Sequence, residues 1–87
     1  MKLTQKDKIM LAILKGHEKK WWDARDFQNG DNFVGWEASA RLSELTKDYY
    51  MIFEIAKDGR FRQVRLNWKN KQMIKQLIKA YKDVGLW

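Results

Sequence analysis

Apolar residues recur every three or four positions near both ends of the chain, with polar residues between them. Near the N-terminus this spacing predicts a helix from about Gln5 to Lys15, with Thr4 as its N-cap. Near the C-terminus it predicts a helix that starts at about Asn70 and ends near Gly85, with an apolar stripe formed by Ile74, Leu77, Ile78 and Tyr81.

Two further helices are predicted in the first half of the chain. Asp23 is placed to cap a short helix that contains Phe27 and stops at the turn dipeptide Asn29-Gly30. The next helix is expected from Glu37 to Thr46. Helical spacing gives it a core side with Ala38, Arg41, Leu42 and Leu45, and an opposite side with Trp36, Ala40, Ser43 and Lys47.

The pattern then changes to β-branched and aromatic residues, which predicts a strand from Tyr49 to Ala56. Asp58-Gly59 predicts a two-residue hairpin turn, after which the chain returns as a strand from Arg60 to Asn67. Alternation places four residues on the core side, Phe53, Ile55, Val64 and Leu66. It leaves four cations near the tip or on the outer face, Lys57, Arg60, Arg62 and Arg65.

These elements predict an α+β fold of three helices, a β-hairpin and a closing C-terminal helix. The chain contains no proline, linker, repeat or low-complexity tract, so a single domain over residues 1–87 is expected. Within it, residues 1–67 form the predicted core and residues 68–87 form a basic amphipathic helix.

The net charge of +7 in 87 residues favours a polyanionic partner, with nucleic acid first among the candidates. The distribution of this charge is uneven, because residues 57–87 carry nine Lys or Arg against two Asp or Glu, whereas residues 34–56 carry two against four. The positive field is therefore expected over the hairpin turn and the last helix.

The remaining composition argues against several classes of function. The absence of cysteine excludes disulfides and thiolate metal sites, and the single histidine, His17, cannot form a histidine cluster. No phosphate-binding glycine loop or nucleophile with a visible base is present, so neither catalysis nor a cofactor is predicted. No apolar run approaches the roughly 20 residues of a membrane helix, which favours a soluble protein of the cytoplasm.

Four segments carry a resemblance to a known family: LTQKDKIMLAILKG, WDARDF, ASARLSEL and IFEIAKDGRFRQVRLN. Together, over roughly Leu3 to Asn67, they resemble small phage and prophage proteins of the winged helix-turn-helix superfamily. In that family the third helix generally enters the major groove of DNA and the hairpin, or wing, touches the phosphate backbone. The resemblance implies DNA contacts for Trp36, Ser39, Ala40, Ser43 and Lys47 on the third helix and for Lys57, Arg60 and Arg62 on the wing.

Several of these candidates have a second interpretation. Arg41 fits a phosphate contact and equally a structural arginine paired with a carboxylate. The two serines fit solvated helix positions as well as contacts to bases or phosphates. The lysine row of the last helix, Lys71, Lys75 and Lys79, fits a solvated face, a strip of DNA backbone contacts, or the border of a homodimer interface.

The five tryptophans allow a similar division. Trp22 and Trp68 are expected to pack between the helices and the hairpin, because core filling is the usual role of a large aromatic residue. The adjacent Trp21 and the helix-start Trp36 cannot both point inward with their neighbours, so at least one exposed tryptophan is expected.

Two functions are therefore expected. The first is a double-stranded DNA-binding protein, a small phage-type regulator acting in a bacterial cytoplasm, with the third helix in the major groove and the wing on phosphates. The alternative is a protein-interaction module on the same scaffold, which binds or inhibits a host or phage protein.

Overall fold

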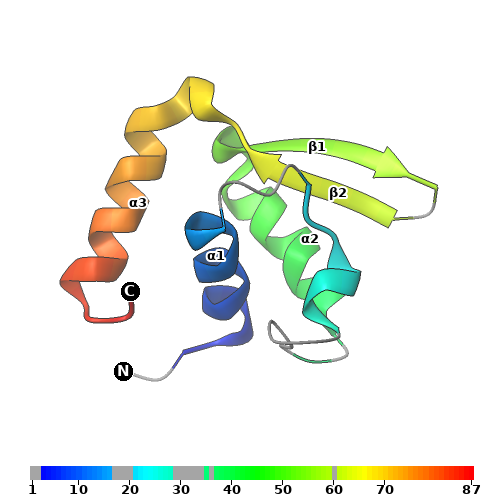
Figure 1. The fold of residues 1–87 in the computed structure, drawn as a ribbon, viewed down its shortest axis with the longest axis horizontal. Coiled ribbons are helices and arrows are strands. Elements are labelled where there is room, and N and C mark those ends of the chain that lie inside the picture. The colour runs from blue at the N-terminus through cyan, green and yellow to red at the C-terminus, as the bar shows by residue number, and fades with distance from the viewer. Residues whose placement is uncertain (1–2, 17–20, 29–34, 36, 60) are drawn as a thin grey trace.

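The computed structural model describes residues 3–16, 21–28, 35, 37–59 and 61–87. Within these residues the chain forms three α-helices and a two-stranded antiparallel hairpin, so it is an α+β structure (Figure 1). None of the helices in the described part of the chain is long and apolar enough to cross a membrane.

The first helix, α1, spans Gln5–Lys15, as predicted. Its start is fixed by a capping box, in which the Thr4 hydroxyl accepts a bond from the Asp7 backbone N–H at 3.1 Å and the Asp7 carboxylate accepts one from the Thr4 backbone N–H at 3.2 Å. Its apolar face is buried, with Ile9, Met10, Ile13 and Leu14 at most 3% exposed.

The second predicted helix is a single 3₁₀ turn, η1 (Ala24–Phe27), instead of an α-helix. Asp23 does cap it, since its carboxylate accepts a hydrogen bond from the Arg25 backbone N–H at 2.8 Å. Four residues are too few for the i to i+4 hydrogen bonds of an α-helix, and i to i+3 bonds close the turn instead. The predicted stop at residues 29–30 lies outside the described residues.

The helix α2 spans Ala38–Asp48, so it begins one residue later and ends two residues later than predicted. Its core side carries Ala38, Leu42 and Leu45, all at most 3% exposed. Thr46 is also buried, although the sequence pattern did not predict it. Its hydroxyl donates to the Ser43 carbonyl at 2.9 Å, so this polar group has a hydrogen-bond partner within the helix.

The predicted strand start at Tyr49 is wrong. Residues Tyr50–Ile52 form a 3₁₀ turn, η3, and the strand β1 begins only at Phe53 and runs to Asp58. The aromatic and apolar side chains favour a strand, but the chain leaves α2 through this turn, where Ile52 N–H donates to the Tyr49 carbonyl at 3.0 Å.

The returning strand β2 spans Phe61–Leu66 and pairs with β1 so that Asp58 faces Phe61. Asp58, predicted to be the first residue of the turn, is therefore the last paired residue of β1. Gly59 occupies the first loop position with φ of +62°, a conformation that glycine adopts without a steric penalty.

Ile55 differs from its predicted core position. It faces Val64 across the hairpin, yet Ile55 is 50% exposed whereas Val64 is fully buried. The difference arises because β1 is an edge strand, whereas β2 has a neighbour on both sides. Trp22 forms an isolated antiparallel bridge with Val64, with both backbone hydrogen bonds at 2.7 Å.

Trp22 also explains a glycine at the end of α1. Its indole stacks on Phe27 with ring centroids 5.4 Å apart, and a Cβ atom added at Gly16 would lie only 2.7 Å from the indole. The predicted core role of Trp22 is confirmed, and a residue with a side chain at position 16 would have to displace it.

The C-terminal segment begins with a 3₁₀ turn, η4 (Trp68–Asn70), and continues as α3 (Lys71–Asp83). In Figure 1, α3 lies on one side of α1, and α2 with the hairpin lies on the other. Ile74 is fully buried, and the core cluster is completed by partly buried residues of the same helix, Leu77, Ile78 and Tyr81.

Trp68, predicted to be core, is 46% exposed, because the turn directs the following helix, and not this side chain, onto the core.

Replacement of Ile74 by alanine should lower the free energy of unfolding by about 2–4 kcal/mol, because it leaves a cavity in a fully buried site. Urea denaturation followed by circular dichroism measures this change. Met73→Ala is the matched control on the same helix turn, and because Met73 is 42% exposed its effect should stay below about 1 kcal/mol. Equal losses in the two variants would contradict the docking of α3 on the core.

A second prediction concerns the hydrogen bond from the Tyr81 hydroxyl to Asp7, 3.0 Å long. Burial and then this bond raise the pKa of Tyr81 well above its usual value. A raised folded-state pKa gives stability that is present below about pH 10, the unfolded value, and is lost as pH rises toward the folded value.

Stability of the native chain should therefore fall above pH 10 with a component that Tyr81→Phe lacks. At neutral pH the variant should be less stable by about 1 kcal/mol, the usual net value of one hydrogen bond, and the difference should shrink above pH 10. Urea midpoints between pH 7 and pH 11.5 measure both effects. Tyr50→Phe, at a tyrosine that is 69% exposed, is the control and should follow the native curve.

Candidate nucleic-acid interface

The loop end of the hairpin carries two cations that face each other. Lys57 lies directly opposite Arg62 in the β1–β2 register, and both side chains are exposed. Alternation puts them on the same face as Phe53, Val64 and Leu66, but nearer the loop, beyond the part of that face that is buried. They continue the core side of the hairpin as a charged end.

Two like charges directly opposite each other destabilise a hairpin slightly. Neither Lys57 nor Arg62 forms an ion pair with a carboxylate whose side chain the structure describes. The pair thus keeps its charge available, and an anion placed between the two side chains would relieve their repulsion. Arg60, the third predicted cation of this end, lies outside the described residues.

Arg65 differs from these two cations. Its Nε donates to a Glu54 carboxylate oxygen at 2.5 Å, and its guanidinium lies 4.4 Å from the centre of the Trp21 ring. Glu54 and Arg65 face each other in the strand register, so this pair follows directly from the position of the turn. Arg65 is on the outer face of the hairpin, but its charge is engaged within the molecule.

The exposed side of α2 agrees with the predicted helix face. Ser39, Ala40 and Lys47 are exposed and Ser43 is partly exposed. Opposite them lie the buried residues of the helix, so α2 presents a surface of small side chains with one cation at its C-terminal end. Trp36, the remaining candidate on this face, lies outside the described residues.

The acidic residues of α2 are paired with cations. Lys6 of α1 lies 3.2 Å from Glu44 and 3.7 Å from Asp48, and Arg41 lies 3.4 Å from Glu44. The hydrogen bond to Glu44 raises the pKa of Lys6. These contacts link α2 to α1 and offset the two negative charges of the helix. They also favour the structural interpretation of Arg41.

The lysine row of α3 is exposed at Lys71, Lys75 and Lys79. In Figure 1, this helix lies at the opposite end of the long axis from the loop of the hairpin. Its apolar stripe packs on the core of the same chain. The row therefore forms a second positive surface, separate from the hairpin end.

A group of exposed apolar residues was not anticipated from the sequence. Where η3, η4 and the start of α3 meet, four large side chains are 42–69% exposed, and we call them the turn patch: Tyr50, Met51, Trp68 and Met73. The Asn70 side-chain amide donates to the Met51 carbonyl and holds the two turns together. The sequence pattern assigned Tyr50 and Met51 to a strand, which concealed this surface.

The described residues contain no group of three or more His, Cys, Asp or Glu side chains arranged to hold a metal ion. His17 lies outside them.

Comparison of the chain with models of known families, with curated proteins and with solved structures finds no match.

Proposed function

We propose that this chain is a winged-helix protein that binds double-stranded DNA, with α2 in the major groove and the β1–β2 hairpin as the wing. The order of elements supports the proposal, because a helix, a capped turn and a second helix precede the hairpin. The bridge between Trp22 and Val64 adds a third extended segment beside β2, which suits a sheet that anchors a wing to the helices.

The observation that carries the proposal is the pair formed by Lys57 and Arg62. Both are exposed, directly opposite each other and without an ion pair among the described carboxylates. Exposed cations that lie close together can each contact a phosphate of DNA. Every such contact releases condensed counterions from the DNA, and this release favours binding. The wing would thus supply affinity without reading sequence.

The surface of α2 suits the other half of such a complex. Its exposed Ser39 and Ala40 are small enough for close approach to base edges, and Lys47 can reach a phosphate. The pairing of Glu44 and Asp48 with Lys6 and Arg41 reduces the repulsion that two free carboxylates on this helix would cause. A regulatory role of the phage type follows from the resemblance of the sequence.

Loss of the wing cations should change the salt dependence of binding. In Lys57→Ala/Arg62→Ala, affinity for all duplex sequences should fall, and the slope of log affinity against log salt should become shallower by roughly 1.8, since each phosphate contact contributes about 0.9. Fluorescence anisotropy with a random-sequence duplex at several salt concentrations measures the slope.

The control is Lys8→Ala/Lys15→Ala, which removes the same charge from exposed positions of α1. This control should alter the slope by less than half as much, because its effect is limited to the long-range field. If the two double variants give the same slope, the wing does not contact phosphates.

The turn patch favours a second candidate function, the binding of another protein. Tyr50 and Trp68 are the residue types that most often anchor protein interfaces, and here both are more than 40% exposed. The same residues have no evident use in a complex in which α2 and the wing face DNA.

A nucleic-acid binding panel distinguishes the two candidates. The DNA-binding proposal requires that duplex DNA binds at low salt, more tightly than single-stranded DNA or RNA of the same length, with affinity that falls steeply as salt increases. Trp68→Ala should leave this binding unchanged. Failure to bind any of the three nucleic acids at low salt would reject the DNA-binding function and favour the protein-binding one.

A further inference from the structure

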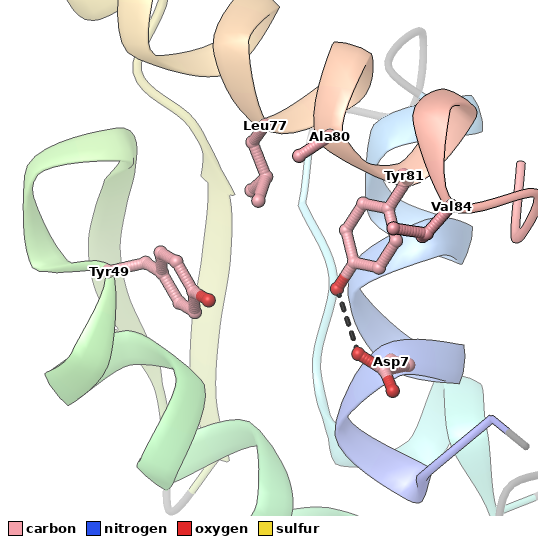
Figure 2. Close-up of a pocket in the computed structure, with 6 residues that line it drawn as sticks. All are labelled: Asp7, Tyr49, Leu77, Ala80, Tyr81 and Val84. Atoms are coloured by element: carbon pink, nitrogen blue, oxygen red, sulfur yellow. Dashed lines mark hydrogen bonds between the residues drawn. The ribbon is translucent and has the colours of Figure 1, made fainter. Parts of the chain in front are cut away.

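A pocket of about 260 Å³ lies between α1, the C-terminal end of α2 and α3 (Figure 2). The described residues that line it are Asp7, Tyr49, Leu77, Ala80, Tyr81 and Val84. It is smaller than the roughly 300–1,000 Å³ of pockets that hold drug-sized ligands, so it suits a small molecule.

The walls of the pocket differ in chemistry. Leu77 and Ala80 of α3 and Val84, directly after it, form an apolar side, and Val84 remains 49% exposed. Two tyrosine rings approach from opposite sides, Tyr49 from the end of α2 and Tyr81 from α3, and the carboxylate of Asp7 lies beside the Tyr81 hydroxyl (Figure 2).

Asp7 is the charged residue among the described lining residues, and its hydrogen bonds all come from neutral donors. One carboxylate oxygen accepts from the Thr4 hydroxyl at 2.9 Å and the Thr4 backbone N–H at 3.2 Å. The other accepts from the Tyr81 hydroxyl at 3.0 Å. No lysine or arginine of the described residues forms an ion pair with it.

Asp7 is ionised at neutral pH. Burial raises the pKa of its carboxyl, but the bonds from Thr4 and Tyr81 outweigh this effect and hold the pKa below its usual value. A carboxylate oxygen has two acceptor positions, so the oxygen bonded to Tyr81 retains one for a further donor. In a protein with a net charge of +7, this pocket thus contains a carboxylate that has no ion pair with a described lysine or arginine.

We propose that this pocket binds a small free organic amine in its ammonium form, with the ammonium group donating to Asp7 between the two tyrosine rings and an apolar body against α3. The electron-rich faces of aromatic rings attract cations, and a carboxylate supplies a charge-assisted hydrogen bond. Leu77, Ala80 and Val84 offer the apolar contact that an alkyl or aryl group requires. This binding is independent of the DNA-binding function.

The test is a titration of the full chain with phenethylamine at pH 7, followed by two-dimensional NMR. Amide signals of α3 near Leu77 and of Asp7 should shift in a saturable manner. The neutral 2-phenylethanol and the anionic 3-phenylpropionate, which have a similar apolar body, should bind at least tenfold more weakly. Equal binding of all three would overturn the proposal, because the site would then select only apolar surface.

Variants locate the site. Tyr49→Ala should weaken phenethylamine binding roughly two- to fivefold through loss of one ring. Tyr50→Ala, at the adjacent tyrosine that is 69% exposed and outside the pocket, should have no effect.

Asp7→Asn should weaken phenethylamine binding roughly tenfold or more, and circular dichroism checks that α1 remains folded without the charged cap. Full affinity in both Tyr49→Ala and Asp7→Asn would overturn the assignment.

The ammonium group could also be the side chain of a lysine in a partner protein. A parallel titration with N-acetyl-lysine amide separates the two sources. Tighter binding of phenethylamine supports a free amine. Binding of the lysine derivative alone would overturn the assignment in favour of a protein partner.

Discussion

The fold depends on the contacts of Trp22 with β2. Its backbone forms both bridge hydrogen bonds with Val64, and its indole packs on Phe27 and beside Gly16. One residue thus joins the end of α1, the η1 turn and the hairpin. Because the strand β2 is bonded on both edges, the position of the hairpin relative to the helices is fixed by backbone geometry as well as by packing.

This anchoring gives the hairpin two different ends. Near the helices its core side is covered, and Phe53, Val64 and Leu66 are buried. Toward the loop this side is no longer covered, so Lys57 and Arg62 are exposed, whereas Ile55 is half exposed because it lies on the edge strand β1. Along this face of the hairpin, the residues that pack on the helices are apolar, and the exposed residues near the loop are cations.

The charges of the chain are sorted in a comparable way. Negative side chains of α2 are paired with Lys6 and Arg41, and Glu54 is paired with Arg65. Many of the cations without such partners among the described residues lie at the hairpin end and along α3, and others, such as Lys8 and Lys47, lie on α1 and α2. The positive charge of the last third of the sequence is therefore divided between two surfaces. Asp7 is an exception, since its carboxylate has hydrogen bonds from Thr4 and Tyr81 and no ion pair with a described cation.

Local patterns in the sequence determined the helix α1 with its Thr4 cap, the buried face of α2, the existence of the hairpin and the apolar stripe of α3. Each depends on contacts between residues close in the chain, which periodicity and capping chemistry encode. The same reasoning identified Lys57 and Arg62 as exposed candidates, because a short turn leaves them at the end of a hairpin.

Only the tertiary structure decided the exposure of Ile55 and Trp68, the contact of Arg65 with Trp21, the ion pairs of Lys6 with α2 and the pocket beside Asp7. These features depend on which segments distant in sequence come together, such as Trp22 with Val64 and Tyr81 with Asp7. An alternating pattern states which side of a strand a residue occupies, but the cover over that side comes from another part of the chain. For that reason the sequence alone determined the elements, and tertiary packing decided which of their side chains remain available for binding.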